Sequence, residues 1–174
     1  MLMKFAAPVA ALLLIGGSAY AQSAKPNDAQ IAHIAYTAGQ IDIANAEQAL
    51  KKSKNKEVRE FAQDMLRDHK AVNEKALALV KKLGVTPEAN PTSKALSSQA
   101  DQKRAELAKL SGAAFDRVYV AHEVAYHRTV NGALKDTLIP SAQNAELKSL
   151  LQTGLALFSE HQAHAEHLAA SQKK

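Results

Sequence analysis

Residues 55–83 read NKEVREFAQDMLRDHKAVNEKALALVKKL, and their pattern favours an all-α fold. Apolar side chains recur at intervals of three and four residues, and Lys, Arg, Glu and Asp fill most positions between them. That spacing predicts an amphipathic helix with one buried face. Gly84 is well placed to end the helix, because glycine readily adopts the left-handed conformation found at helix C-termini. His69 lies within the apolar series, so the helix directs an ionisable side chain toward the core.

Helical spacing extends through most of the remaining chain. Asn27 and Gln30 are spaced as a capping box before a helix expected over 28–53, and two prolines mark a linker after residue 83. Further helices are expected over 55–83, 92–110, 113–138 and 144–171, and the 92–110 helix has little apolar stripe. No strand-like alternation of useful length occurs in the sequence. We therefore predict an all-α fold, an up-down four-helix bundle with 92–110 as an extra short connecting helix.

The composition excludes several classes of protein. The chain has 174 residues, of which 47% are apolar and 22% charged, with no Cys and a formal net charge of +5. These values fit one globular domain and exclude a disulfide scaffold, a thiol redox enzyme and a Cys-ligated zinc or iron–sulfur site. Much of the positive charge lies in a basic cluster at the expected first turn, Lys51, Lys52, Lys54, Lys56 and Arg59. This basic cluster is too local and too poor in aromatic residues to indicate a nucleic-acid groove, so we expect no nucleic-acid partner.

The N-terminal residues have the three parts of a secretory signal peptide. Lys4 supplies the positive charge, residues 5–15 form a short apolar run, and Ala19-Tyr20-Ala21 is a small-x-small cleavage site. The run is shorter than the roughly 20 residues of a membrane-spanning helix, and an uncleaved N-terminal anchor is the alternative. We expect residues 1–21 to be removed and residues 22–174 to form one exported, periplasmic domain without an integral membrane span.

Each of the four expected bundle helices places one ionisable residue in its apolar seam. The last helix repeats apolar residues at alternating steps of three and four, and His161 occupies one of these positions. Asp42, His69 and His127 occupy seam positions of the other three helices. Glu123 precedes His127 by four residues and lies on nearly the same helical face. The pattern therefore predicts that these groups point into the bundle.

The turn positions predict which of these groups face each other. In an antiparallel hairpin, two residues lie at one height when their midpoint in the sequence falls on the turn. The midpoint of Asp42 and His69 falls on the turn at residues 54–55, so we expect them to be level within ~1.5 Å. The midpoint of His127 and His161 falls a few residues past Pro140, so we expect them to be level only within one helical turn, ~5 Å.

Burial of ionisable groups is costly unless they are paired, and this leaves three arrangements open. In a hydrogen-bond network, Asp42 accepts from His69, while Tyr119, Tyr126 or water satisfies the other groups. In a metal site, the histidines and carboxylates bind one transition-metal ion, of Fe, Zn, Cu or Mn, as facing helices of a bundle often do. In the third arrangement, the predicted register is wrong and one of the groups faces water.

Other histidine motifs do not indicate an enzyme. Residues 122–127 read HEVAYH, whereas the zinc-protease motif HExxH needs both histidines on one helical face. His164 and His167 follow His161 at three-residue steps, and we expect these two on a solvent-exposed face. The sequence contains no glycine-rich phosphate loop, no GxSxG and no Cys nucleophile. We therefore favour a binding protein over an enzyme.

Three stretches together resemble a known bacterial family. They are VREFAQDMLRDH at residues 58–69, FDRVYVAHEVAYH at residues 115–127 and FSEH at residues 158–161. With the signal peptide and Asp42, they are similar to an exported family catalogued as domain of unknown function 4142. The resemblance covers nearly all of the chain after residue 21. It implies a ferritin-like bundle and an association with the outer membrane, and the family has no settled activity.

The resemblance also implies a candidate site. The recurrent polar positions of the family correspond to Asp42, Asp68, His69, His127 and His161. The family more usually shows Glu where this chain has Asp42, and the shorter side chain reaches less far. Di-iron ferritins carry Glu-x-x-His motifs, but residues 66, 124 and 158 here are Leu, Val and Phe. A classical di-iron ferroxidase centre is therefore not expected.

Two functional hypotheses follow. The first is a periplasmic metal-binding or metal-stress protein that holds one transition-metal ion through the three seam histidines. In that protein Asp42, Asp68 or Glu123 supplies an oxygen ligand or orients a histidine. The second is a non-enzymatic envelope module whose inward polar groups are purely structural and whose basic cluster contacts an anionic envelope surface.

Overall fold

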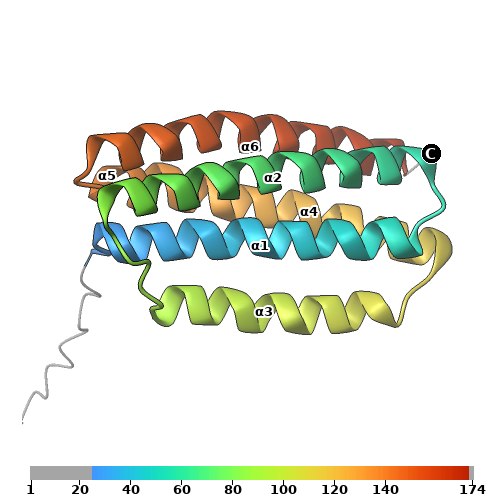
Figure 1. The fold of residues 1–174 in the computed structure, drawn as a ribbon. Coiled ribbons are helices and arrows are strands. Elements are labelled where there is room, and N and C mark those ends of the chain that lie inside the picture. Colours follow the sequence, from blue (N-terminus) through green and yellow to red (C-terminus); the bar gives the residue numbers. More distant parts are fainter. Residues whose placement is uncertain (1–24, 173–174) are drawn as a thin grey trace, which may run out of the picture.

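The computed structural model describes residues 25–172, which form five long helices (Figure 1). A π-helical turn, η1 (Leu134–Leu138), and the short helix α5 (Ile139–Ser141) join the last two of them. Within this range the chain contains no strand. The expected signal peptide, residues 1–21, lies outside the described residues. The long helices are α1 (Asp28–Lys52), α2 (Lys56–Leu83), α3 (Pro91–Ala108), α4 (Gly112–Ala133) and α6 (Ala145–Ser171).

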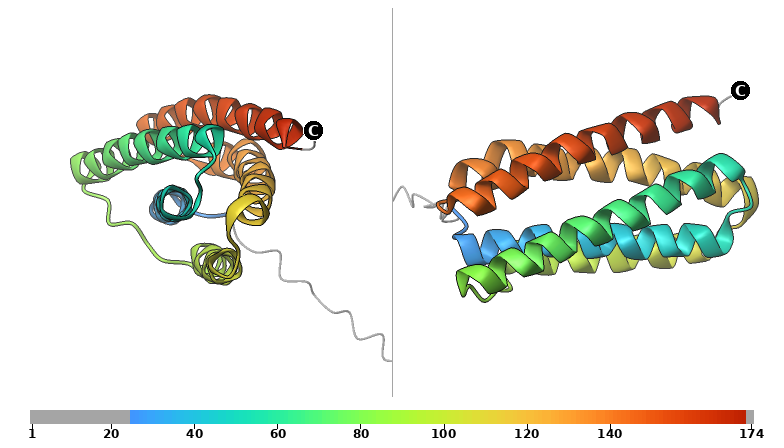
Figure 2. Two further views of the ribbon diagram at one scale, coloured as in Figure 1. Left: turned by 90° about the vertical axis from the view of Figure 1, so that its right-hand side faces the viewer. Right: turned by 45° about the horizontal axis from the view of Figure 1, so that its top comes forward.

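Helices α1, α2, α4 and α6 form a four-helix bundle in which each helix runs antiparallel to its neighbours (Figures 1 and 2). The hairpins α1–α2 and α4–α6 make up its two halves, and α2 packs on α6 while α1 packs on α4. Helix α3 lies outside the bundle against α1 and carries the chain back to the end at which α4 begins. The predicted all-α four-helix bundle with a connecting helix is therefore confirmed.

Asparagine side chains begin four of the long helices. Asn27, Asn55, Asn90 and Asn144 each accept a hydrogen bond from a backbone N–H of the first turn, which has no partner inside the helix. The capping box predicted at Asn27 is present. At the other end of α2, Gly84 has a φ of 64° and ends the helix, as its position in the sequence predicted.

The helix expected over 113–138 ends differently from the prediction. Helix α4 passes at Leu134 into the π-helical turn, and the helical path continues through Pro140 to Ser141. The Ile139 N–H donates to the Leu134 carbonyl, five residues earlier, so the usual hydrogen-bond pattern is already interrupted before Pro140. A proline, which lacks an N–H, is therefore tolerated here. The other bounds lie within two residues of the expected ranges.

Two hydrophobic clusters lie in the bundle, one on either side of its middle. Near the α1–α2 turn, the first cluster contains the aromatic rings of Phe61, Phe115 and Tyr119. Toward the opposite end, the second cluster consists of aliphatic side chains such as Leu138 together with Phe158. The polar seam residues of the four helices lie between the two clusters, which places the candidate site at mid-bundle.

Candidate metal centre

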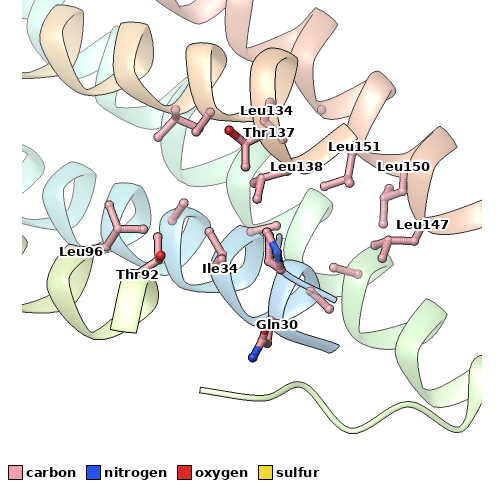
Figure 3. Close-up of a pocket in the computed structure, with 18 of the residues that line it drawn as sticks. Gln30, Ile34, Thr92, Leu96, Leu134, Thr137, Leu138, Leu147, Leu150 and Leu151 are labelled. Carbon is pink, nitrogen blue, oxygen red and sulfur yellow. The ribbon is translucent and has the colours of Figure 1, made fainter. Parts of the chain in front are cut away.

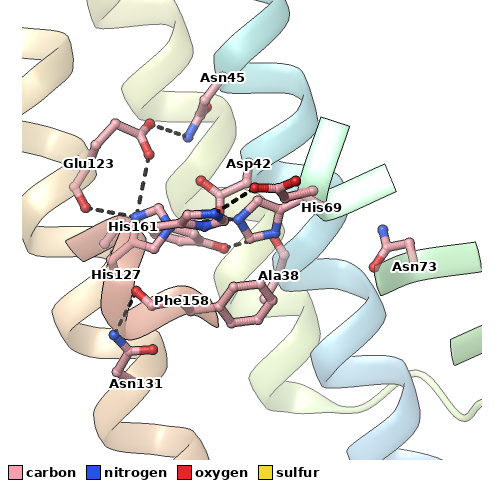
Figure 4. Close-up of polar contacts among 12 residues, drawn as sticks. Ala38, Asp42, Asn45, His69, Asn73, Glu123, His127, Asn131, Phe158 and His161 are labelled. Atoms are coloured by element: carbon pink, nitrogen blue, oxygen red, sulfur yellow. Dashed lines mark hydrogen bonds and ion pairs between the residues drawn. The ribbon is translucent and has the colours of Figure 1, made fainter. Parts of the chain in front are cut away.

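Ionisable side chains from all four bundle helices meet in the middle of the bundle (Figure 4). Asp42 on α1, His69 on α2, His127 on α4 and His161 on α6 are 2%, 2%, 1% and 5% exposed. Glu123, one turn before His127, is fully buried beside them. The prediction that these seam residues point inward is confirmed, and the arrangement in which one of them faces water is wrong.

The three imidazoles form a compact group, which we call the histidine triangle. The ring centroids of His69 and His127 are 5.7 Å apart, those of His69 and His161 are 5.4 Å apart, and those of His127 and His161 are 5.6 Å apart. Each ring has one nitrogen that can act as a ligand atom, and these three nitrogens all lie within 4.8 Å of one another. Asp42 Oδ2 lies 3.4 Å from His69 Nε2 and 4.0 Å from His127 Nε2. Asp42 and His69 therefore face each other as the turn position predicted.

Each imidazole of the triangle has a nitrogen without a hydrogen-bond partner among residues 25–172. Nδ1 of His127 is 3.1 Å from the Glu123 carbonyl oxygen, which can only accept, so Nδ1 carries the proton and Nε2 is a buried lone pair. In His161, Nε2 is 3.0 Å from Asp68 Oδ2, and Nδ1 is the unpartnered nitrogen. Neither nitrogen of His69 has a hydrogen-bond partner in the described part of the chain. The triangle therefore concentrates unsatisfied ring nitrogens in one small buried volume.

Asp68 lies beside the triangle and orients one of its members. Its side chain is 19% exposed, and its carboxylate accepts from Arg67 Nε at 2.8 Å as well as from His161. Partial burial acts to raise the pKa of Asp68, but the hydrogen bonds from Arg67 and His161 hold it below its ordinary value. A carboxylate bound to one ring nitrogen fixes the imidazole and makes the other nitrogen a better ligand. Of the two roles expected for Asp68, oxygen ligand or orienting residue, its hydrogen bond to His161 favours the orienting role.

Asp42 and Glu123 form a buried carboxyl pair next to the triangle. Together with His127, they make a second group whose ligand atoms all lie within 4.8 Å of one another. Burial raises the pKa of Glu123 to about 7, and burial together with the proximity of Glu123 raises the pKa of Asp42 well above its ordinary value. Two adjacent buried carboxyl groups cannot both ionise without a large cost, so the pair holds a proton near neutral pH.

The three histidines are neutral at pH 7 because they are buried. Burial lowers the pKa of His127 to about 4. The pKa of His69 lies well below its ordinary value. Burial is the larger cause, and the proximity of the other two imidazoles is the smaller one. Burial also lowers the pKa of His161, although Asp68 opposes this effect. Neutral imidazole is the form that can bind a metal ion, so burial keeps the three rings in that form at physiological pH.

The tyrosines expected to satisfy these histidines do not do so. The Tyr126 hydroxyl donates to the Ala38 carbonyl at 3.1 Å. The Tyr119 hydroxyl has no hydrogen-bond partner in the described part of the chain. Among residues 25–172, the two tyrosines therefore do not complete the expected hydrogen-bond network, and water is the partner which that alternative leaves.

Phe158 and two asparagines, whose roles the sequence analysis missed, support the site. The Phe158 ring stacks on His69, with centroids 4.5 Å apart and an interplanar angle of 12°. Asn131, four residues after His127, donates to the Phe158 carbonyl at 3.1 Å. Asn45 donates from Nδ2 to Glu123 Oε1 at 3.4 Å. Helical spacing from the seam residues was the signal that could have identified both asparagines.

The basic cluster lies at the α1–α2 turn, and two of its members hold helix ends together. Lys52 Nζ donates to the Ala108 carbonyl at the end of α3 at 2.7 Å. Arg59 donates to the Ser53 carbonyl just after α1 at 3.1 Å. These cations thus satisfy backbone carbonyls that helix ends leave free. Contact between the basic cluster and an anionic envelope surface stays a prediction.

No helix within residues 25–172 combines the length and apolar character needed to cross a membrane.

Comparisons with known proteins identify the fold and the family. The fold is similar to the crystal structure of a protein from Streptomyces coelicolor described as a secreted DUF305 protein. The TM-score is 0.69, the match covers 83% of this chain and 92% of that one, and the identity is 12%, so the likeness concerns the fold. Among curated proteins, none matches the chain. Because the model of the family DUF4142, described as a domain of unknown function, matches residues 16–168, the chain belongs to that family.

Proposed function

We propose that this protein is an exported metal-binding bundle that holds one transition-metal ion within the histidine triangle. The observation that carries the proposal is the approach of three buried, neutral imidazoles: one nitrogen of each lies within 4.8 Å of the other two, and each ring has a nitrogen without a hydrogen-bond partner among residues 25–172. A buried polar atom without a partner costs ~1–3 kcal/mol. Packing alone does not account for three such groups brought together from three helices, whereas one metal ion accepts all three lone pairs.

The donor set fits an ion of Fe, Zn, Cu or Mn. His69, His127 and His161 supply imidazole nitrogens, and Asp42 offers a carboxylate oxygen next to two of the rings. Nitrogen and carboxylate donors of this kind are used for all four ions. Glu123 lies within reach of His127 and can accept the proton that Asp42 gives up when it binds an ion.

The surroundings of the site support storage or handling of an ion over catalysis. Each histidine of the triangle and Asp42 is at most 5% exposed, and the Phe158 ring covers His69. A substrate has no access to an ion held there without movement of the helices. The signal-like residues 1–21 and the description of the structural neighbour as secreted support an extracytoplasmic location. We therefore favour a periplasmic role in metal binding or metal stress.

Metal content is the test. The protein is expressed with its own export signal and without a histidine tag, and the metal in the purified protein is measured by elemental analysis. Wild type is expected to retain about one equivalent of a transition metal, and a triple variant, His69→Ala, His127→Ala and His161→Ala, to retain none. The matched control, His164→Ala with His167→Ala, alters two exposed histidines of α6 and is expected to retain the wild-type content.

Asp68→Asn provides a second variant that keeps every proposed ligand. It is expected to weaken metal binding about 10- to 100-fold in a chelator competition, with helicity unchanged, because His161 loses its carboxylate partner. Circular dichroism establishes that each variant is folded. A folded wild type that stays free of metal after incubation with Fe, Zn, Cu and Mn salts would contradict the proposal, as would full retention by the triple variant.

A further inference from the structure

The half of the bundle that holds the aliphatic cluster is hollow (Figure 3). A cavity of about 660 Å³ lies between the first half of α1, the second half of α2, the start of α3, the end of α4 with η1, and the first half of α6. Its volume falls within the ~300–1,000 Å³ of typical small-molecule sites. The cavity is separate from the histidine triangle, and Phe158 is the wall between them.

The cavity exists because small residues line it where the other half of the bundle carries aromatic rings. Ala35, Ala38, Ala76 and Gly154 belong to its lining. A Cβ atom on Gly154 would already contact the Phe158 ring at 3.4 Å. Protein interiors are normally packed as densely as organic crystals, so small lining residues contributed by several helices leave a space there.

The lining indicates the chemistry of an occupant. Most of it is Ala, Val, Ile, Leu and Pro; among the described residues that line the cavity, Lys25 is the only charged one and none carries a carboxylate. Lys25 precedes α1, and the amide of Asn90 at the start of α3 donates to the Gln30 carbonyl at 3.3 Å, so polar groups gather at this end. An apolar chain fits the wall, and a negatively charged head group fits the end that carries the cation.

We propose that the cavity binds a single-chain fatty acid, with its tail among the aliphatic side chains and its carboxylate beside Lys25. The tail runs toward Phe158, which closes the cavity on the side of the histidine triangle. This inference does not depend on metal binding. It is therefore tested in protein stripped of metal with a chelator, so that failure of one proposal leaves the other intact.

The probe is cis-parinaric acid, a polyunsaturated fatty acid that becomes fluorescent in apolar surroundings. Wild type is expected to bind it saturably, and Ala133→Trp to bind it at least about tenfold more weakly, because the indole occupies the cavity mouth. Ala125→Trp is the matched control, since Ala125 is also exposed on α4 but does not line the cavity. Ala76→Trp on α2 blocks the cavity from a second side, and Ala78→Trp is its exposed control.

The position of the head group has its own test. Lys25→Glu is expected to weaken binding of the acid several-fold and to leave binding of the methyl ester of the probe unchanged. Equal binding of the acid by this variant and wild type would overturn the placement of the carboxylate. Absence of saturable binding, or equal binding by the Ala133→Trp and Ala125→Trp variants, would overturn the proposal. The proposal would also be overturned if wild type were a dimer and the Ala133→Trp variant a monomer. In that case a second copy of the chain, and not a fatty acid, would cover the cavity.

Discussion

The buried site combines ionisable residues whose pKa values are shifted in opposite directions. Burial lowers the pKa values of His69, His127 and His161, which are therefore uncharged at pH 7. Burial raises the pKa values of Asp42 and Glu123, which therefore hold a proton between them. The core thus contains five ionisable groups with little net charge, which is how a bundle tolerates them without a metal ion.

Glu123→Gln tests this account through the pH dependence of stability. The pKa of Glu123 is about 7 in the folded protein, whereas its ordinary value, expected in an unfolded chain, is 4.5. Between these values the folded state binds a proton that the unfolded state lacks, so Glu123 makes stability fall as pH rises. Metal-free wild type is therefore expected to lose about 2 kcal/mol more unfolding free energy than Glu123→Gln between pH 5 and pH 8, measured by urea denaturation.

The control for this measurement is Glu160→Gln, at an exposed position of α6. It is expected to follow the wild-type pH dependence. If Glu123→Gln also follows wild type, then Glu123 does not hold the extra proton in the folded state.

At the scale of the elements, the close approach of α1 and α2 depends on a glycine. Gly39 on α1 faces the Asn73 side chain on α2, and a Cβ atom at residue 39 would lie 2.8 Å from Asn73 Cγ. Asn73 Nδ2 donates to the Tyr36 carbonyl of α1 at 3.4 Å. The glycine thus lets a polar side chain of one helix reach the backbone of the other, one turn from Asp42 and His69. This contact helps set the spacing of the hairpin that presents them.

Gly39→Ala is expected to destabilise the protein although alanine favours helix. The overlap with Asn73 is expected to lower the unfolding free energy by about 1–3 kcal/mol in urea denaturation. Gly132→Ala is the matched control on α4, because nothing lies within 4 Å of a Cβ there, and it is expected to stabilise by up to about 1 kcal/mol. A Gly39→Ala protein as stable as the Gly132→Ala protein would show that the two helices approach less closely.

At the scale of the whole molecule, hydrogen bonds tie the two hairpins together at one end of the bundle. The Asp28 carboxylate at the start of α1 accepts from the backbone N–H groups of Gln143 and Asn144 before α6, both at 2.8 Å. At the same end, the Glu88 N–H of the α2–α3 linker donates to the Ala29 carbonyl at 3.0 Å. Three segments far apart in the sequence are thus joined at the end of the bundle that contains the cavity.

Asp28→Ala is expected to weaken this connection without unfolding the bundle. Loss of two charge-assisted hydrogen bonds is expected to lower the unfolding free energy by about 1–3 kcal/mol. Hydrogen exchange of the Gln143 and Asn144 amides is expected to accelerate most. The control is Asp101→Ala on α3, which removes an exposed ion pair within one helix and is expected to change stability by less than about 1 kcal/mol. Unchanged exchange at both amides would contradict the role of Asp28.

Local patterns in the sequence were sufficient to predict the bundle and the inward direction of its polar residues. Helical periodicity and capping are local properties, so residues a few positions apart are enough to place Asp42, His69, His127 and His161 in seams. The turn position was enough to bring Asp42 level with His69, because a short turn fixes the register of a hairpin. The family resemblance led to the same positions, and the match of the DUF4142 model to residues 16–168 confirms the family.

Which atoms meet depends on packing between helices, which local sequence patterns do not specify. The pairing of Asp68 with His161 joins residues on α2 and α6, and ring orientation depends on packing between helices distant in sequence. The π-helical turn before Pro140 and the cavity beside Phe158 likewise depend on how side chains from several helices fill or leave a shared volume. Periodicity specifies the helical face on which a side chain lies. The hydrogen-bond partner of His161, the ring nitrogens left without a partner and the cavity follow from packing in three dimensions.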